Sequence, residues 1–333
     1  MPTFVENLNT RRLRWWAALV AACLLAAGCS FVRLSYDNFP SLARWEIDRY
    51  LDLDSDQEAI VTRHLEELHR WHRQEQLPQY GAFLREVDDG LRTPLDPSQV
   101  RVWRERVGAA WLPVAERLAP GLAELALTLR PAQIEPKRKR LAESNDKYRK
   151  THLPAQPGAR EEARAERLVK RAVFFLGEVT DGQESELRAR AVTLPASEDD
   201  WLAERQARQQ RLVALLERLR REQPSRERAT ELARHYLSTV WSSQDPQRSE
   251  RLAGAVAASD ALTAAAVAQA TPRQREYLSK LLLGYVQDAE ALSGRSQVAS
   301  ADAGSRGAGA GGRAAPATPT AMQGGAAATL GLR

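Results

Sequence analysis

Apolar residues recur at helical spacing along almost the whole chain, and this periodicity limits the fold more than any other feature of the sequence. Between residues 80 and 91, the apolar side chains fall at intervals of three and four, which places them on one face of a helix. The same spacing returns in five more segments: 100–118, 168–176, 212–219, 232–241 and 278–292. No segment alternates apolar and polar residues as a half-buried strand would. We therefore expect an all-α protein, a bundle of about ten to twelve helices with no sheet.

The N-terminus has the features of a bacterial export signal followed by a lipid-attachment site. Three arginines within residues 11–14 form a positive region, and about 13 apolar residues follow from Trp15, too few to span about 30 Å of hydrocarbon. The run Leu25-Ala-Ala-Gly-Cys29 resembles a lipobox, in which Leu and small residues precede the cysteine that receives diacylglycerol. We expect residues 1–28 to be a lipoprotein signal peptide and Cys29 to be the lipidated N-terminus of the mature protein.

Acylation of Cys29 would leave the mature protein without a free thiol, because the only other cysteine, Cys23, lies inside the signal peptide. Disulfides, zinc–thiolate sites and cysteine nucleophiles are then excluded. Each buried CH₂ of an acyl chain contributes about 0.8 kcal/mol, so several chains form a firm membrane anchor. Ser30 follows the anchor. By resemblance to proteobacterial lipoproteins, in which Asp at this place favours inner-membrane retention, it predicts the periplasmic leaflet of the outer membrane.

The charge distribution gives no argument for nucleic-acid binding. The chain has 48 Lys and Arg against 43 Asp and Glu, a formal net charge of +5 and an isoelectric point near 9.4. The whole excess lies in the signal peptide and in the last forty or so residues, so the part that is left to fold is neutral. A nucleic-acid-binding domain would carry a basic surplus of its own. We therefore expect no nucleic-acid partner.

Composition and prolines divide the chain into segments. Residues 294–333 are rich in Ala, Gly, Ser, Pro and Thr without an apolar stripe, and we expect them to form a disordered low-complexity tail. The run Leu-Pro-Ala-Gln-Pro-Gly at 153–158 is the strongest candidate for a linker, between an N-terminal helical bundle (29–152) and a C-terminal one (159–293). The alternative is a long connection inside one bundle. Further breaks are expected at prolines, among them Pro94, Pro97, Pro113, Pro120, Pro131, Pro195, Pro224, Pro246 and Pro272.

A four-residue pattern that ends in Gln recurs where helices are expected to begin. Its copies are Asp54–Gln57, Asp96–Gln99, Arg130–Gln133, Thr180–Gln183 and Thr271–Gln274. We interpret it as a capping box, in which an Asp or Thr oxygen accepts the N3 amide and Gln reaches back to the N-cap amide. Proline in the second place fits the first helical position, where no amide hydrogen is needed. Such tetrads also resemble those of small periplasmic chaperones of helical-cradle type.

The densest polar and aromatic segment runs from Tyr36 to Tyr80. It contains Tyr36-Asp-Asn, Arg44-Trp45, Asp48, Tyr50, Trp71-His-Arg, Glu75 and Leu77-Pro. In this pattern the chain resembles proteobacterial lipoproteins of domain-of-unknown-function family 6279, over most of the mature chain to about residue 290. The resemblance implies an exported, mostly helical lipoprotein and no assigned reaction.

Helical spacing within this segment predicts a binding surface on two antiparallel helices. Its eight residues are Arg44, Trp45, Asp48, His69, Trp71, His72, Arg73 and Glu75. We expect the two arginines of this surface to pair with its carboxylates, while its two tryptophans form an apolar floor. The alternative is a structural clamp, with both tryptophans in the core and the ion pairs at its rim.

Recognisable signatures of metal or catalytic chemistry are lacking in the sequence. Glu66-x-x-His69 has the spacing of a di-iron ligand pair, but such a site needs a second pair and the sequence holds none. The His-Glu-x-x-His pattern, the Gly-x-Ser-x-Gly elbow and the P-loop do not occur. We therefore expect no metal and no cofactor, and we name no catalytic residue.

Residues 137–140, Lys-Arg-Lys-Arg, form the strongest basic block. We expect these side chains to face solvent or the acidic segment 37–60. The alternative is contact with anionic lipid headgroups or another polyanion of the envelope.

These features together predict a lipid-anchored, periplasm-facing helical lipoprotein that acts by binding another envelope protein, as a scaffold, an adaptor or a chaperone-like partner. Trp, Tyr and Arg, which are favoured as interface anchors, are frequent in segment 36–80. The competing hypothesis is a cell-envelope hydrolase or transferase that uses the polar residues of the same segment.

The lipid anchor can be tested directly with Cys29→Ala. This variant should take up no radioactive palmitate and should accumulate as a precursor that keeps the signal peptide. Cys23→Ala serves as the control and should label and mature normally. Labelling of Cys29→Ala at the wild-type level would show that the acylated residue is a different one.

Overall fold

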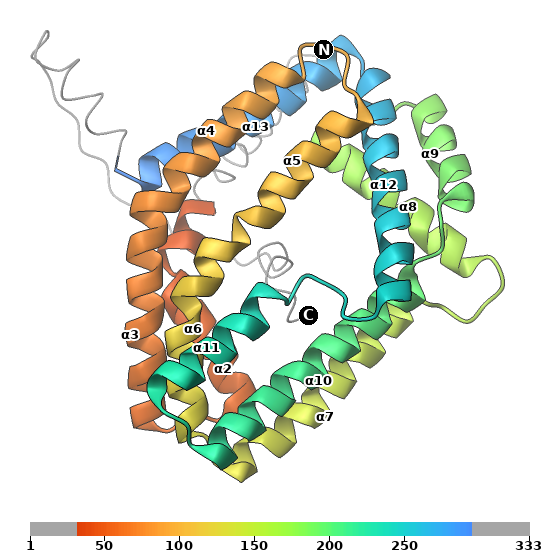
Figure 1. The fold of residues 1–333 in the computed structure, drawn as a ribbon. Coiled ribbons are helices and arrows are strands. Elements are labelled where there is room, and N and C mark those ends of the chain that lie inside the picture. Colours follow the sequence, from red (N-terminus) through yellow and green to blue (C-terminus); the bar gives the residue numbers. More distant parts are fainter. Residues whose placement is uncertain (1–31, 295–333) are drawn as a thin grey trace, which may run out of the picture.

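The computed structural model describes residues 32–294, and all regular structure within that range is helical (Figure 1). The helices are α2 (Phe39–Leu51), α3 (Ser55–Trp71), the π-helical turn η1 (His72–Gln76), α4 (Leu77–Gly90), α5 (Pro97–Ala109), α6 (Trp111–Thr128), α7 (Pro131–His152), α8 (Ala159–Leu176), α9 (Asp181–Thr193), α10 (Glu198–Glu222), α11 (Arg226–Ser238), α12 (Pro246–Ala268) and α13 (Pro272–Leu292). The all-α prediction is confirmed for this part of the chain, as is the expected number of helices. The predicted signal peptide, Cys29 and the predicted tail from 295 on lie outside the described residues.

The tightest helix pair in the core is formed by α6 and α11. Small side chains line the contact, and all of them are almost fully buried: Ala115, Ala119, Ala123 and Ala126 on α6, and Ala229 and Ala233 on α11. Alanines at this spacing let two helix backbones approach closely over several turns. At one end of the pair, Trp111 Nε1 donates a hydrogen bond to the carbonyl oxygen of Leu237 at 2.7 Å.

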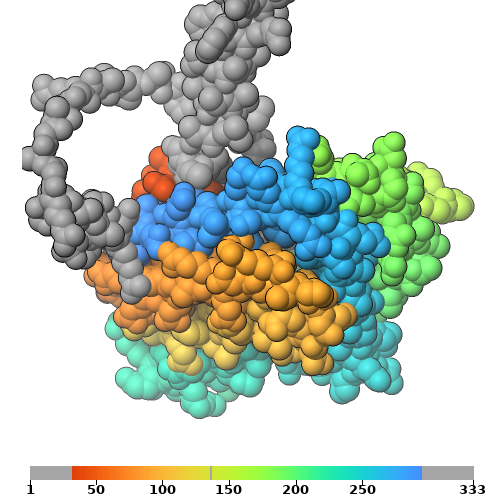
Figure 2. Space-filling model, turned by 90° about the horizontal axis from the view of Figure 1, so that it is seen from above, coloured from red at the N-terminus to blue at the C-terminus, as the bar shows by residue number. Residues whose placement is uncertain are grey.

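Helices from before and after residues 153–158 pack against one another throughout the fold. The pair α4 and α13 lies side by side in both views, α5 packs on α12, and α7 packs on α10 (Figures 1 and 2). The main hydrophobic core takes side chains from both parts, for example Leu125 of α6 and Leu216 of α10. This packing is the one expected if 153–158 is a connection inside one bundle.

Two of the prolines do not break a helix, contrary to our expectation. Pro113 and Pro120 both lie inside α6. Pro113 is in the first turn, where backbone amides have no intrahelical partner, so its missing hydrogen costs little. Pro120 is in the interior, where a proline costs about 3 kcal/mol, and the burial of the flanking alanines against α11 offsets this cost.

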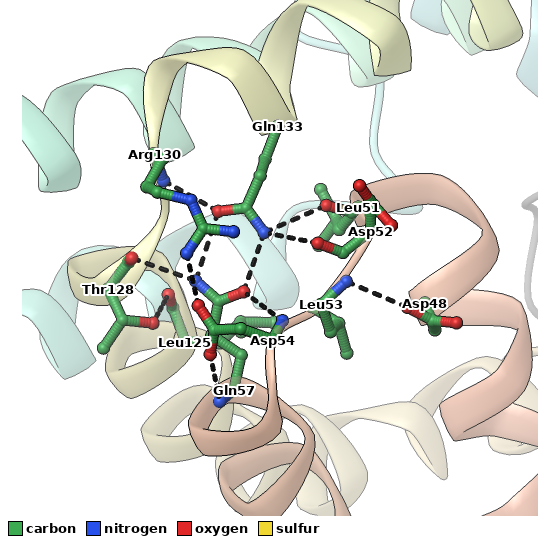
Figure 3. A network of polar contacts seen from close by, with 10 residues as sticks. All are labelled: Asp48, Leu51, Asp52, Leu53, Asp54, Gln57, Leu125, Thr128, Arg130 and Gln133. Carbon is green, nitrogen blue, oxygen red and sulfur yellow. Dashed lines mark hydrogen bonds and ion pairs between the residues drawn. The ribbon is translucent and has the colours of Figure 1, made fainter.

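Two of the glutamine tetrads meet and join two helix starts (Figure 3). Gln57 Nε2 donates to Gln133 Oε1 at 3.2 Å, and Gln133 Nε2 donates back to Gln57 Oε1 at 2.7 Å. Each Oε1 also accepts the backbone amide of its own N-cap residue, Asp54 or Arg130. Each Nε2 also donates to backbone carbonyl oxygens that precede the partner helix, those of Thr128 and Asp52 among them. The start of α3 is thereby fixed to the start of α7.

The other two paired tetrads repeat this arrangement at the starts of α9 and α13. Gln183 Nε2 donates to Gln274 Oε1 at 3.0 Å, and Gln274 Nε2 donates back to Gln183 Oε1 at 2.8 Å. The Oε1 atoms again accept the amides of the N-cap residues, Thr180 and Thr271. The capping-box interpretation is confirmed for these two helices and for α3.

Two tetrads depart from the expected capping box. Asp96 caps α5 by accepting the Ser98 amide at 2.6 Å, and Gln99 does not reach back to it. Arg130 has no side-chain acceptor, so only the Gln133 half of the box forms at α7, and the Arg130 guanidinium instead forms an ion pair with Asp54.

One helix in the described range, α12, is long and apolar enough to cross a membrane when judged by length and composition alone. In this structure it packs on α5. There its buried Asp260 accepts hydrogen bonds from Arg104 Nε at 3.0 Å and from Arg104 Nη2 at 3.0 Å. A buried carboxylate with a bidentate guanidinium partner fixes α12 against α5.

Gln57→Ala should lower the free energy of unfolding by about 2 to 3 kcal/mol, because it removes the two hydrogen bonds to Gln133 together with those to the Asp54 amide and the Thr128 carbonyl oxygen, and leaves the amide of Gln133 without its partner. Urea denaturation would measure the change. Gln99→Ala, in the same place of an unpaired tetrad, is the matched control and should cost less than about 0.5 kcal/mol. The double variant Gln57→Ala/Gln133→Ala should cost less than the sum of the single ones. Strict additivity would contradict the pairing.

Candidate functional site

The histidines near the end of α3 lie in a cluster of aromatic rings. His72 Nδ1 is 2.8 Å from the hydroxyl oxygen of Tyr36, and the Tyr80 ring meets His72 edge-on with centroids 5.4 Å apart. The His69 ring lies 4.7 Å from the Tyr36 ring. We call Tyr36, His69, Trp71, His72 and Tyr80 the aromatic–histidine cluster.

A π-helical turn shapes this cluster. In η1 the Leu77 amide donates to the carbonyl oxygen of His72, five residues back, and Pro78 follows immediately. Because Pro78 has no amide hydrogen, the regular ladder is interrupted there, and the wider turn accommodates the interruption. A π-helical turn contains one residue more than an α-helical turn, and this extra residue turns His72 toward Tyr36 and Tyr80. Turns of this kind are frequent at functional sites.

Burial keeps the cluster uncharged at neutral pH. It lowers the pKa of His72 to about 4, with a smaller contribution from His69. The pKa of His69 is lowered by burial and by the neighbouring Arg73, and the pKa values of Tyr36 and Tyr80 are raised, chiefly by burial. A neutral imidazole can accept at Nδ1, so the Tyr36 hydroxyl donates to His72. The cluster is therefore a neutral, hydrogen-bonded contact between the N-terminal helical residues and α3.

The ion pairs expected within the predicted binding surface do not form. Arg44 pairs with Glu58 at 3.2 Å, and Arg73 pairs with Asp37. The carboxylates are also engaged elsewhere, since Asp48 Oδ1 accepts the Leu53 amide at 2.9 Å and Glu75 accepts the Trp71 indole N–H at 2.8 Å.

The register of α2 on α3 explains this difference. The helices are antiparallel, as expected, with Phe39 close to His69 and Arg44 close to Glu58. Arg44, Trp45 and Asp48 therefore lie several turns away from the residues 69–75. The structure does not bring the two halves of the predicted surface together.

The two tryptophans of the predicted surface differ in burial. Trp71 is 8% exposed and carries the Arg117 guanidinium 4.9 Å from its ring centroid. Trp45 is 58% exposed, with the Arg49 guanidinium 5.5 Å from its ring. Trp71 is thus a core residue, as the clamp alternative predicted, whereas Trp45 is a surface residue. The two tryptophans therefore do not form one apolar surface.

A larger feature, which the sequence reasoning missed, is a cavity of about 280 Å³ in the main core, which we call the core cavity. It lies between α2, α3, α6, α7, α10 and α11. Its lining residues are Glu46, Ile47, Tyr50, Leu51, Val61, His64, Leu65, Trp111, Leu118, Gly121, Leu122, Leu125, Lys137, Leu141, Arg208, Gln209, Leu212, Leu216, Tyr236, Leu237, Val240 and Trp241. Most of these side chains are aliphatic or aromatic, so the wall is mainly apolar.

One side of the cavity depends on a close approach between α6 and α3. A Cβ atom added at Gly121 would lie 2.8 Å from Cβ and Cγ of His64, a distance that real structures do not show. Glycine at this position therefore lets the His64 ring lie flat against α6. In that place His64 Nε2 is 3.0 Å from the Glu124 carboxylate.

The basic block 137–140 does not behave as one solvated stripe, contrary to our expectation. Lys137 is 7% exposed and lines the core cavity, whereas Arg138 is at the surface and pairs with Glu217 at 2.6 Å. The helical spacing explains the difference, because Lys137 falls between Ile134 and Leu141 on the buried face of α7. That spacing was visible in the sequence, and the run of four basic residues obscured it.

The rim of the core cavity is formed where the chain leaves α11. Trp241 is 50% exposed, the most exposed of the lining residues, and its ring meets the Trp111 ring edge-on at 6.0 Å. The Arg208 guanidinium lies 5.4 Å from the Trp241 ring and donates to the Val240 carbonyl oxygen at 3.3 Å. Two tryptophans and one arginine therefore surround the opening.

Two other depressions are weaker candidates. One, of about 20 Å³ beside α9 and α12, has room for about one water molecule. The other is a polar groove between the outer faces of α6 and α11, with Glu124 and Arg226 among its residues. In the part of the chain that the structure describes, no group of three or more His, Cys, Asp or Glu side chains is placed to hold a metal ion.

His72→Gln tests the electrostatics of the aromatic–histidine cluster. Between pH 6.5 and pH 4 the unfolded chain binds a proton at His72 that the folded chain does not bind, so the free energy of unfolding falls as the pH falls through this window. From pH 7 to pH 4.5 this single group should cost about 2 kcal/mol, and His72→Gln should lose that part of the pH dependence. His235→Gln, on an exposed face of α11, is the control. Parallel pH profiles for the wild type and His72→Gln in urea denaturation would contradict the assignment.

Comparison with known proteins gives a family and no activity. Residues 49–245 match a family of unknown function (DUF6279). This range runs from the end of α2 to the residue before α12. It is shorter than the range that we expected from the sequence, which extended to about residue 290. It includes every lining residue of the core cavity except Glu46 and Ile47. No curated protein and no solved structure matches the chain. Because the match covers more than half of the sequence, the chain belongs to this family of unknown function, DUF6279.

Proposed function

We propose that this protein is a binding protein of the cell envelope that holds a small apolar or amphipathic molecule in its core cavity. The observation that carries the proposal is the cavity itself, about 280 Å³ with a mainly apolar wall in the middle of the main hydrophobic core. Ligand sites in proteins are typically concave, mainly apolar and supplied with a few polar groups. The core cavity has all three properties.

An empty space of this size would be costly to the fold. Protein interiors are close-packed, and an apolar wall that faces an unfilled space loses van der Waals contacts, which costs free energy. An apolar occupant restores the lost contacts and so recovers much of this free energy. The cost of leaving the cavity empty therefore favours a bound molecule.

The size of the cavity limits its occupant. A dry cavity of about 150 Å³ holds benzene, so a space of 280 Å³ corresponds to about ten to twelve carbon atoms. The proposed ligand is therefore a medium-length hydrocarbon chain or a small ring system.

The anchor and the location belong to the same proposal. The export signal and the lipobox at Cys29 support a lipoprotein of a proteobacterial outer membrane, held in its periplasmic leaflet by the acyl chains. The described structure begins at residue 32, three residues after Cys29, and three residues of chain reach at most about 10 Å. The folded part would then lie against the leaflet, where apolar and amphipathic molecules are concentrated.

A protein partner is the second proposed function. Large apolar side chains are exposed on two separate helices, Trp45 on α2 and the adjacent Phe174 and Phe175 on α8. Exposed aromatic side chains of this kind often anchor protein interfaces. They support the binding of another envelope protein, and Trp45 belongs to the surface that the sequence predicted.

A neutral fluorescent probe of about ten carbons, 1-aminonaphthalene, matches the size of the cavity and tests the first proposal. The mature chain with Cys29→Ser, which needs no detergent, should bind the probe with micromolar affinity and a rise in fluorescence. Leu212→Trp should weaken binding at least tenfold, because the larger ring occupies part of the cavity, and it should leave the free energy of unfolding unchanged or higher by about 1 kcal/mol.

The control for this variant is the same substitution at an exposed leucine outside the cavity, Leu283→Trp on α13, which should leave probe binding unchanged. If the wild type does not bind the probe, or if Leu212→Trp binds it as the wild type does, the core cavity is not the binding site.

A further inference from the structure

Lys137 brings a charged group into the wall of the core cavity. Its side chain projects from the buried face of α7, it is more than nine-tenths buried, and it lines the cavity. Within residues 32–294 its ammonium has neither a hydrogen bond nor an ion pair. Buried ammonium groups in folded proteins are almost always paired, and no described protein group pairs with this one, which faces the cavity.

The other polar side chains of the wall are already engaged, so none of them can supply that partner. The Glu46 carboxylate is held by Arg49 at 2.7 and 3.0 Å. His64 lies against Glu124, and Gln209 Oε1 accepts the Asn145 amide at 2.7 Å. The hydroxyl of Tyr236 donates to the backbone carbonyl oxygen of Arg208.

The surroundings of Lys137 disfavour its charge but do not remove it at neutral pH. Burial, with no contribution from a neighbouring charge, lowers its pKa to about 8. At pH 7 the group is therefore still mostly protonated. An ammonium in an apolar wall without a counter-ion is destabilising, and an acidic group at the same place would remove the penalty.

We infer that the core cavity takes an amphipathic anion, with its acidic head group on the Lys137 ammonium and its hydrocarbon part along the aliphatic wall. This inference rests on the proposed binding function and adds the chemical class of the ligand. The carbon count from the cavity volume gives a chain of about ten to twelve carbons. A carboxylate and a phosphate monoester share the required head-group chemistry.

The rim of the cavity is compatible with an anion. Arg208 stands at the opening, and in the described part of the chain it has no carboxylate partner and donates only to the Val240 carbonyl. The one carboxylate in the cavity wall, that of Glu46, is neutralised by Arg49. The Arg208 guanidinium, which also lies near the Glu204 carboxylate, is therefore the cationic group at the path into the cavity.

A set of ligands with the same chain and different head groups tests the inference on the wild-type protein. Decanoate, decyl phosphate, decanol and decyltrimethylammonium would each be used to displace bound 1-aminonaphthalene from the mature chain with Cys29→Ser at pH 7. Because a hydrogen bond to a charged group adds about a factor of 10 to 100 in affinity, decanoate or decyl phosphate should displace the probe at concentrations that much lower than decanol. The cationic ligand should be the weakest. Acetate and inorganic phosphate, which lack the chain, should not displace the probe.

Lys137→Met links this preference to one residue. Methionine keeps the length and apolar stem of lysine, so the variant should fold, bind the probe as the wild type does and lose the preference for the anions over decanol. Lys139→Met, on the exposed side of the same helix, is the matched control and should keep the full preference. The two anions distinguish a carboxylate ligand from a phosphate ligand by their relative affinities.

The outcomes separate the inference from the function on which it rests. If the probe binds but decanoate and decyl phosphate have no advantage over decanol, or if Lys137→Met keeps that advantage, the inference is overturned and the apolar binding function stands. If neither the probe nor any of the decyl ligands binds, both are overturned. Should Lys137→Met fail to fold, the head-group series on the wild type decides alone.

Discussion

The buried pair of Gln57 and Gln133 is the interaction on which the rest of the structure depends most. Two amides in an apolar core are tolerated only when their donors and acceptors are paired, and here each side chain joins its own helix start to the partner helix (Figure 3). The pair thereby fixes the rotation of α7 about its own axis. Lys137 is one turn beyond Gln133 on the same face, so the rotation that buries the glutamine also turns the lysine into the core cavity. The polar contact at one end of the helix thus determines the chemistry of the cavity wall.

The two faces of α6 show how a close-packed core can contain a cavity of this size. On the side of α11, alanines allow the backbones to approach closely, and on the other side Leu118, Leu122 and Leu125 line the cavity. Closing the cavity would require α6 to move toward α2, α7 and α10. The tight contact with α11 and the close approach of Gly121 to His64 both oppose that movement. The cavity therefore persists because its walls are held by contacts outside it.

The features that depend on local residue spacing, the helices and their caps, could be predicted from the sequence. The contacts that depend on how one helix is aligned against another could not. Apolar periodicity and the capping tetrads identified the helices and several of their first residues, because caps and stripes are properties of one helix. That Gln57 would meet Gln133 could not be foreseen, since 76 residues separate them and nothing local encodes the contact. The pairing expected for Arg44 failed because it assumed a register between α2 and α3 that the contact of Phe39 with His69 excludes. The core cavity belongs to six helices at once, so no segment of the sequence carries its signal.

Buried polar groups therefore have two different roles in this fold, and the presence of partners separates them. The glutamine pairs use most of their hydrogen-bonding capacity within the protein, and such groups make one arrangement of helices more stable than its alternatives. The ammonium of Lys137 has no partner in the described structure, so it adds nothing to the specification of the fold and destabilises the unliganded state. Other incompletely paired groups, such as Arg211 and Arg248, each have a further guanidinium nitrogen bonded to Glu204. The Lys137 side chain has a single nitrogen, so it has no second donor that could be paired in the same way. A ligand with an acidic group would supply the missing hydrogen-bond acceptor and counter-charge.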